Sequence, residues 1–187
     1  MNTTELFTRS VEEFDRRVKL VQDDQWELPT PCSEWNVRDL VNHMVYEDVW
    51  APPLFQGKTI AGVGDAFDGD LLGDDPVGVW EVASADARAA INEPGALEKT
   101  VHVSFGDIPG DMYAQQLFSD HLIHAWDLAR GIGDVDKLDA ELVAVCYAAL
   151  KPIEDALKAS GIYGEKIEPP EGADTQAKLL AVVGRRA

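Results

Sequence analysis

The sequence predicts a mainly α-helical bundle with one small β element. Apolar residues recur every three or four positions over most of the chain, which is the period of an amphipathic helix. Alternation of apolar and polar residues, the period of a strand, is found in one short segment. The chain has 187 residues, 45% of them hydrophobic, which is enough to bury a core without disulfide bonds. We therefore expect a single domain that spans residues 1–187.

The N-terminal part is expected to contain two helices followed by a long connection. The first helix is predicted over residues 3–22, where a heptad-like apolar stripe runs until two prolines interrupt it. The second is predicted over residues 36–50, with Asn36 as its N-cap and Asp39 in its first turn. Residues 51–76 are rich in Gly, Pro and Asp, which predicts an irregular connection.

The central part is expected to add a helix, a strand and a second helix. The third helix is predicted over residues 77–92, before a Pro-Gly pair. Alternation over residues 100–105 predicts a strand that is closed by turn residues. The next helix is predicted over residues 111–130, with Gly131 as its C-terminal stop.

The C-terminal part is expected to be helical as well. One helix is predicted over residues 136–161, with a kink at Pro152 because proline removes a backbone donor. A further short helix is predicted within residues 174–186. These elements together predict a mainly helical bundle with a small β element.

Charge and composition exclude several classes of protein. The formal net charge is -18, with 16 basic residues scattered among 34 acidic ones, which argues against binding to nucleic acid. The longest apolar run, residues 142–150, is too short to span a membrane, and the charged N-terminus does not resemble a signal peptide. Cys32 and Cys146 form no CxxC pair, which favours a reducing compartment. We expect a soluble, cytoplasmic protein.

The segment DHLIHAWDLARG, residues 120–131, combines ionisable side chains with the pattern of a buried helix. Such groups cost free energy in a core unless a side chain, a water or a metal ion satisfies them. Asp120 and His124 lie four residues apart and therefore share one face of the helix. His121 and His124 form a competing pair on a partly overlapping face. A third ligand would have to come from elsewhere, and His43 in the second predicted helix is the candidate.

The spacing alone leaves two interpretations of His43 open. It lies beside an apolar stripe, where a histidine that donates to a backbone carbonyl is common. Yet bundle cores are also a common place for metal sites that are built from facing helices. Imidazole and carboxylate groups are suitable ligands for zinc, nickel or iron.

Three segments carry a resemblance to a known family. TPCSEWNVRDLVNHMV, HVSFGDIPGDMYAQQLFSDHLIHAWDLARGIG and LLAVVGRR resemble the actinobacterial DinB-like proteins. More closely, they resemble the metal-binding domain of the mycothiol-dependent maleylpyruvate isomerase family. The similarity covers nearly the whole chain in the same order, and the HxWDLA element is fairly specific. It implies a DinB-like four-helix bundle with a small β element and extra short helices.

The resemblance also implies a metal site. In the family, three side chains from two helices hold a divalent ion, usually zinc or nickel. The matching positions here are His43, Asp120 and His124. The isomerase has glutamate where this chain has Asp120, and other DinB-like proteins have histidine there, so this chain carries a shorter ligand.

The function implied is that of a thiol-dependent enzyme. Three protein ligands leave a metal position open, where a thiol such as mycothiol can ionise and attack an electrophilic small molecule. We expect a transferase or an isomerase-like enzyme, although the isomerase has an additional C-terminal domain that this sequence does not include. Two alternatives stay open: a non-catalytic bundle that binds metal or a partner, such as a second copy in a homodimer, and a metal hydrolase that uses Glu47 as a base.

The remaining polar and aromatic residues are given mainly structural roles. Asp127 is expected either to orient a ligand imidazole or to pair with Arg130, with the structural role preferred. His121 is expected beside the metal site, and Glu47 is a reserve ligand or base. Core positions are expected for Cys32, Trp35 and Trp126, and an exposed position is expected for His102.

Overall fold

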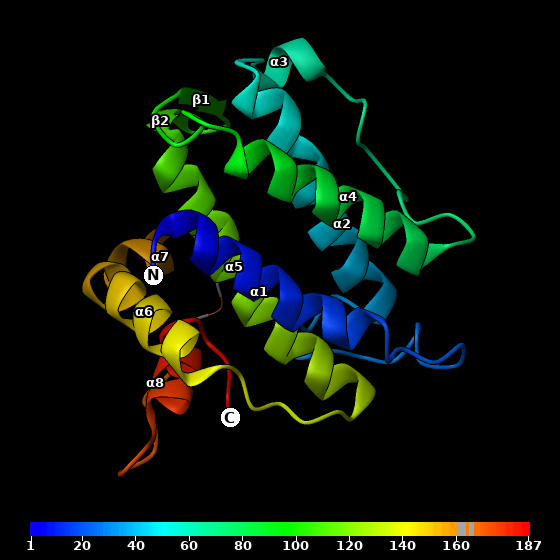
Figure 1. The fold of residues 1–187 in the computed structure, drawn as a ribbon. Coiled ribbons are helices and arrows are strands. Elements are labelled where there is room, and N and C mark those ends of the chain that lie inside the picture. The colour runs from blue at the N-terminus through cyan, green and yellow to red at the C-terminus, as the bar shows by residue number, and fades with distance from the viewer. Residues whose placement is uncertain (161–163, 165–166) are drawn as a thin grey trace. The chain divides into compact units, whose positions relative to one another are not determined.

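The computed structural model describes residues 1–160, 164 and 167–187. Contacts within the chain divide it into two compact units, Met1–Val135 and Asp136–Ala187 (Figure 1). Each unit is described by itself below. That one domain includes both units stays a prediction.

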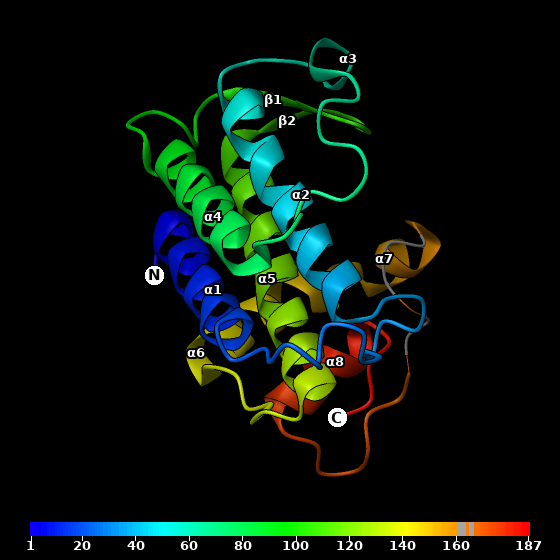
Figure 2. The ribbon, with the colours of Figure 1, turned by 90° about the vertical axis from the view of Figure 1, so that its right-hand side faces the viewer.

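The first unit is a bundle of four helices. They are α1 (Thr3–Val18), α2 (Val37–Phe55), α4 (Pro76–Asn92) and α5 (Gly110–Ile132). Helix α1 packs along α5, α2 packs along α4, and α2 also contacts α5 (Figure 2). The mainly α class that the sequence predicts is confirmed, because apolar residues on each of these helices form one buried core.

The start of α2 follows the predicted capping pattern. The Asn36 side chain accepts a hydrogen bond from the backbone N–H of Asp39, at 2.8 Å. In return, the Asp39 carboxylate accepts from the backbone N–H of Asn36, at 3.1 Å. This capping box satisfies two backbone donors and fixes where the helix begins. Its position determines which residues of α2 face α5.

Two predicted boundaries in this region were wrong. Helix α1 ends at Val18, four residues before its predicted end. Helix α2 continues to Phe55 through Pro52 and Pro53, because Leu54 and Phe55 are buried and hold the last turn against the core. The irregular connection is therefore shorter than expected. It also contains a short helix, α3 (Ile60–Val63).

The predicted single strand is a two-stranded antiparallel hairpin. Strand β1 (Thr100–Val103) pairs with β2 (Gly106–Pro109), and the chain reverses at residues 104–105. Gly106 has a φ of 133°, which side chains other than hydrogen rarely allow. His102 is half-exposed rather than exposed, and its Nδ1 lies 2.7 Å from Asp107 Oδ1 on the facing strand.

The predicted stop of the longest helix was two residues early. Gly133 is the residue in the left-handed conformation, with a φ of 74°, and it caps α5. Gly131 lies inside the helix for another reason. A Cβ atom at this position would lie 3.2 Å from Thr30 Cγ2 and 3.2 Å from Val37 Cγ2. Gly131 therefore allows the chain before α2 to approach α5 closely.

A buried ion pair joins α5 to α2 inside the core. His121 is fully buried, and its Nδ1 lies 2.8 Å from the carbonyl oxygen of Leu117, to which it must donate. Its Nε2 lies 3.3 Å from Asp48 Oδ2 and 3.2 Å from Oδ1. The rings of Phe7 and Trp80 pack around the imidazole. His121 is thus a core histidine whose two nitrogens are both satisfied.

Within its described residues, the second unit contains three short α-helices. The predicted single kinked helix is divided into α6 (Ala140–Leu150) and α7 (Glu154–Ser160) by a 3-10 turn, η1 (Lys151–Ile153), which contains the predicted breaker Pro152. Its predicted last residue, 161, lies outside the described residues. The predicted tail helix is confirmed as α8 (Thr175–Val182), and it packs against α6.

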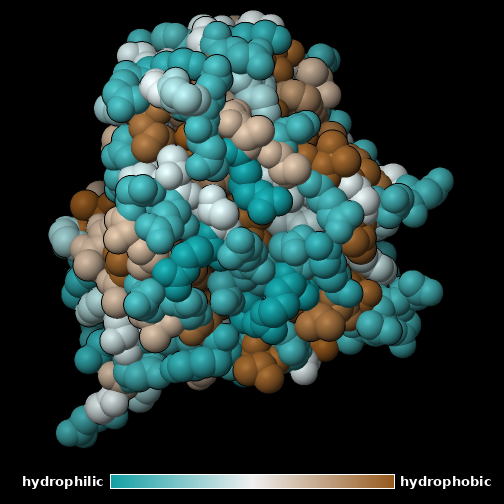
Figure 3. Space-filling view, viewed as in Figure 1, coloured by the Kyte–Doolittle hydropathy of each residue, from teal (hydrophilic) through white to brown (hydrophobic). Residues whose placement is uncertain are grey.

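The surface is mainly hydrophilic where it is shown. Hydrophilic residues cover most of the face that Figure 3 shows. Among the described residues, none of the helices has the length and apolar character that a membrane crossing requires.

The buried pair between α2 and α5 generates a stability prediction. Asp48→Ala should lower the free energy of unfolding of the first unit by about 3–5 kcal/mol, because it leaves the His121 Nε2 group buried without its partner. The exposed substitution Asp86→Ala is the control and should change it by less than about 0.5 kcal/mol. Urea unfolding of the metal-free protein, followed by tryptophan fluorescence, measures both, since all five tryptophans lie in the first unit. A loss below about 1 kcal/mol for Asp48→Ala would contradict the assignment.

Candidate metal centre

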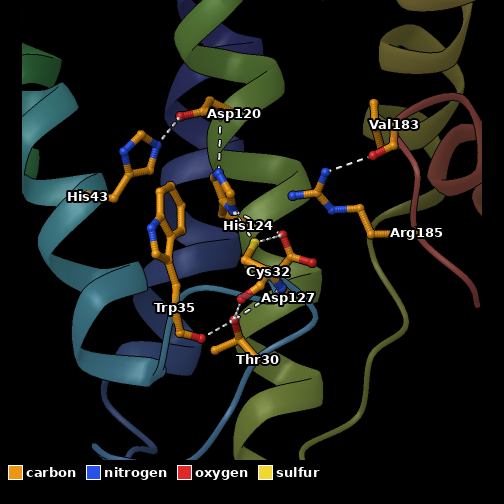
Figure 4. Close-up of polar contacts among 9 residues, drawn as sticks. All are labelled: Thr30, Cys32, Trp35, His43, Asp120, His124, Asp127, Val183 and Arg185. Carbon is orange, nitrogen blue, oxygen red and sulfur yellow. Dashed lines mark hydrogen bonds and ion pairs between the residues drawn. The ribbon is translucent and has the colours of Figure 1, made fainter. Parts of the chain in front are cut away.

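Three ionisable side chains from α2 and α5 converge at one point of the first unit. Asp120 Oδ2 lies 3.2 Å from His43 Nε2, and Asp120 Oδ1 lies 3.4 Å from His124 Nε2 (Figure 4). One ligand atom from each residue lies within 4.8 Å of the other two. The structure therefore brings together the three residues that the sequence singles out. That they hold a metal ion stays a prediction.

The helices explain this convergence. Asp120 and His124 lie one turn apart on α5, so their side chains stack on the same face. His43 lies one turn after the capping residue Asp39 on α2, and α2 packs against α5. Each of the three side chains therefore belongs to a regular helix, which holds it more precisely than a loop would.

The carboxylate at the centre is ionised. Burial alone would raise the pKa of Asp120, but the nearby charge of His124 and the hydrogen bond and charge of His43 hold it well below its usual range. A negative group that faces two imidazole nitrogens is a favourable environment for a cation.

A second carboxylate sets the protonation of His124. Asp127 is fully buried, and its Oδ2 lies 2.9 Å from His124 Nδ1. An ionised carboxylate only accepts hydrogen bonds, so Nδ1 carries the proton. Nε2 is then the nitrogen that faces Asp120 and can bind a metal ion. The contact between Asp127 and His124 is the one that the orienting role requires.

The chemistry of the donor set shows whether these residues fit a metal ion. His124 Nε2 and Asp120 Oδ1 lie 3.4 Å apart, and either a proton or a cation can lie between them. Two imidazoles and one carboxylate are a ligand set that zinc uses in catalytic sites. The residues fit a divalent ion.

The core positions predicted for two residues near the site were wrong. Cys32 is half-buried rather than a core residue, and its thiol donates to Asp127 Oδ2 at 3.3 Å. Trp35 is also half-buried, and its ring centre lies 4.6 Å from that of His43 and 5.7 Å from that of His124. It covers both imidazoles instead of joining the core. Trp126 is buried as expected, with the Arg130 guanidinium over its ring.

Cys32, His124 and Asp127 form a second cluster of ligand atoms within 4.8 Å of one another. This cluster would use His124 Nδ1, whereas the first uses Nε2. A metal bound to Nδ1 would have to displace the 2.9 Å hydrogen bond with Asp127. The first cluster leaves that bond intact, so the chemistry favours it.

A pocket of about 410 Å³ lies beside the first cluster. It includes His43 itself, so one of the converging imidazoles borders this space. Its walls combine two aromatic rings with an amide and three carboxylates. The other lining residues are Glu34, Trp35, Asp39, Asn42, Tyr46, Asp68 and Gly69.

Glu47 and His121 take different places around the cluster. Glu47 lies one turn after His43 on α2, and burial together with the charge of Asp120 raises its pKa to about 7. It can therefore exchange a proton near neutral pH. His121 instead points into the core toward Asp48. Among the described residues, neither of them belongs to a ligand cluster.

The family described as the mycothiol maleylpyruvate isomerase N-terminal domain matches residues 7–129 of the chain. This match spans most of the first unit, including all three converging residues. The chain belongs to this family. It is thus a maleylpyruvate isomerase-like protein, as its sequence motifs predict.

Two curated relatives and two solved structures are similar to this chain. The uncharacterized proteins Rv0738 and MT0763 of Mycobacterium tuberculosis (strains ATCC 25618 / H37Rv and CDC 1551 / Oshkosh) are each 31% identical over 149 residues, which is 78% of this chain and 75% of theirs. The crystal structure of the mycothiol-dependent maleylpyruvate isomerase has a TM-score of 0.63 at 17% identity and covers 87% of this chain and 72% of that one. A mutant of the same enzyme has a TM-score of 0.61 at 15% identity, covering 79% and 68%. These structures share the fold, and the predicted DinB-like bundle is confirmed.

The raised pKa of Glu47 generates a pH prediction. In the window from its usual value of 4.5 to about 7, the folded protein binds more protons than the unfolded chain. The free energy of unfolding of the metal-free protein should therefore fall as the pH rises through this window. Glu47→Gln removes the effect, so it should stabilise the protein by about 1–3 kcal/mol more near pH 8 than near pH 5.

Urea unfolding in the presence of a chelator measures this difference. Glu98→Gln, at an exposed position, is the matched control and should show the same offset from the wild type at both pH values. An equal offset for Glu47→Gln at both pH values would show that Glu47 does not titrate in this window.

Proposed function

We propose that this protein binds one divalent metal ion through His43, Asp120 and His124, and that it uses the ion to activate mycothiol for attack on an electrophilic small molecule. The observation that carries the proposal is the convergence of one ligand atom from each of these three side chains within 4.8 Å, beside a pocket that His43 lines. A divalent ion between them would contact both imidazoles and the carboxylate. Zinc is the expected ion, and nickel and iron suit the same ligands.

Such an ion would supply a positive charge that lowers the pKa of a bound thiol into the neutral range. The chain's own residues supply the rest. Asp127 accepts the Nδ1 proton of His124 and so leaves Nε2 free to act as a ligand. Glu47, with a pKa of about 7, is suited to accept the proton that the thiol releases.

The pocket supports an enzyme rather than a bundle that only binds metal. It borders His43 and offers aromatic faces from Trp35 and Tyr46 together with polar groups. Ligand pockets commonly combine such apolar walls with a few polar groups that fix orientation. We propose that it receives the part of the thiol or of the substrate that lies beyond the reacting atoms.

Two alternatives to this proposal remain open. A metal hydrolase would use Glu47 as the base for a water instead of a thiol, and its raised pKa favours that role as well. The transferase and isomerase reactions share the same thiol activation, and the family name favours the isomerase type. Location in the cytoplasm, where small thiols are kept reduced, and assembly as a homodimer stay predictions.

The proposed metal ligands generate a prediction about metal content. Elemental analysis after reconstitution with zinc should find about one ion per chain. His43→Ala and His124→Ala should each abolish binding, because two remaining ligands make a weak site. His102→Ala is the control and should keep the ion, since His102 lies on the hairpin beside Asp107. If both ligand variants keep a full ion while they remain folded, the metal assignment is wrong.

The proposed thiol generates a prediction about binding to the metal ion. Titration of the cobalt-substituted protein with mycothiol should produce a sulfur-to-cobalt charge-transfer band, and His43→Ala should show none. Glutathione, which is anionic, should bind more weakly because three carboxylates line the pocket. No band with the cobalt-loaded wild type would exclude thiol activation and would favour the hydrolase or the non-catalytic bundle.

A further inference from the structure

The turn formed by residues 30–35 is closed by its own hydrogen bonds. Thr30 Oγ1 donates to the carbonyl oxygen of Trp35 at 2.8 Å and accepts from the backbone N–H of Cys32 at 3.2 Å. The backbone N–H of Trp35 donates to the carbonyl oxygen of Cys32 at 2.8 Å. These bonds fix the side chains of Cys32 and Trp35 relative to each other.

Both side chains reach the imidazoles of the candidate metal centre. The Cys32 thiol donates to Asp127 Oδ2, the same oxygen that accepts the His124 Nδ1 proton, and its sulfur lies 3.9 Å from that nitrogen. Trp35 packs over the rings of both His43 and His124 (Figure 4). The turn thus contacts His124 from two sides.

A glycine on α5 lets the turn come this close. A Cβ atom on Gly131 would lie 3.2 Å from Thr30 Cγ2 and 3.5 Å from the carbonyl oxygen of Pro29. The first distance is shorter than an ordinary carbon–carbon contact, so a side chain here would push the turn away. Gly131 lies one turn after Asp127, which places the approach next to the thiol contact.

We propose that Cys32 is a positioning residue for His124. Its thiol holds the Asp127 carboxylate in the orientation that accepts the Nδ1 proton, and this keeps Nε2 directed at Asp120. The inference rests on the proposed metal site, because its expected consequence is tighter binding of the metal ion. Groups that orient a metal-ligating histidine typically change metal affinity by 10-fold or more when they are lost.

The test compares zinc dissociation constants of matched variants by competition with a chelator. Cys32→Ala removes the donor and should weaken zinc binding by about 10-fold. Cys32→Ser keeps a donor and should stay within about 3-fold of the wild type, because a hydroxyl also donates to a carboxylate. Cys146→Ala, at the other cysteine, should bind zinc as the wild type does.

Two results would overturn the inference while the metal site stands. One is wild-type affinity in Cys32→Ala, and the other is an equal loss in Cys32→Ser and Cys32→Ala. A sulfur-to-cobalt band in the thiol-free wild type that is absent from Cys32→Ala would make Cys32 a ligand and would also overturn it. If His43→Ala binds zinc as well as the wild type does, the proposed metal site itself is wrong, and this result is distinct from those that concern Cys32.

A metal-free readout tests the positioning role separately. Nitrogen NMR of the histidine rings in the chelator-treated protein reports which nitrogen of His124 carries the proton. The wild type and Cys32→Ser should show one tautomer, with the proton on Nδ1, and Cys32→Ala should show a mixture. A single Nδ1 tautomer in Cys32→Ala would contradict the inference whatever the metal does.

Discussion

Asp120 places one ionised carboxylate against two imidazole nitrogens where α2 meets α5, at 3.2 Å from His43 and 3.4 Å from His124. This contact forms only if the neighbouring residues hold the two imidazoles in place. Helix α2 must present His43 at the right turn, which its capping box determines. Asp127 must accept the Nδ1 proton of His124, so that Nε2 is the nitrogen that faces the carboxylate. Two imidazoles and one carboxylate that converge in this way suit a divalent ion, which is why we interpret them as a metal site.

The two histidines of α5 illustrate how one helix serves both core and function. His121 and His124 point about 60° apart around the axis, since each residue turns the helix by about 100°. That difference sends His121 to the buried Asp48 and His124 to the cluster beside the pocket. The ion pair with Asp48 satisfies the buried polar atoms of His121, whereas His124 remains available to bind a ligand. The same segment therefore contributes to stability and to the candidate site through neighbouring residues.

The sequence predicted most of what depends on local chemistry. The bundle follows from helical periodicity, the start of α2 follows from Asn36 and Asp39, and the pairing of Asp120 with His124 follows from their spacing. It did not predict contacts that only the folded chain creates. Cys32 meets Asp127 across 95 positions, and Trp35 covers imidazoles from two helices, so no local pattern separates them from core residues. Glycine at position 131 predicts a helix stop, and its packing against Thr30, which is remote in the sequence, has no local pattern.

X-ray absorption spectroscopy of the zinc-loaded protein, recorded without and with mycothiol, tests the central claim most directly. We expect only nitrogen and oxygen ligands at about 2.0–2.2 Å before the thiol is added, and one sulfur at about 2.3 Å afterwards. Sulfur coordination in the thiol-free protein would place the ion in the cluster of Cys32, His124 and Asp127 instead. That result, or the absence of sulfur at saturating mycothiol, would contradict the account.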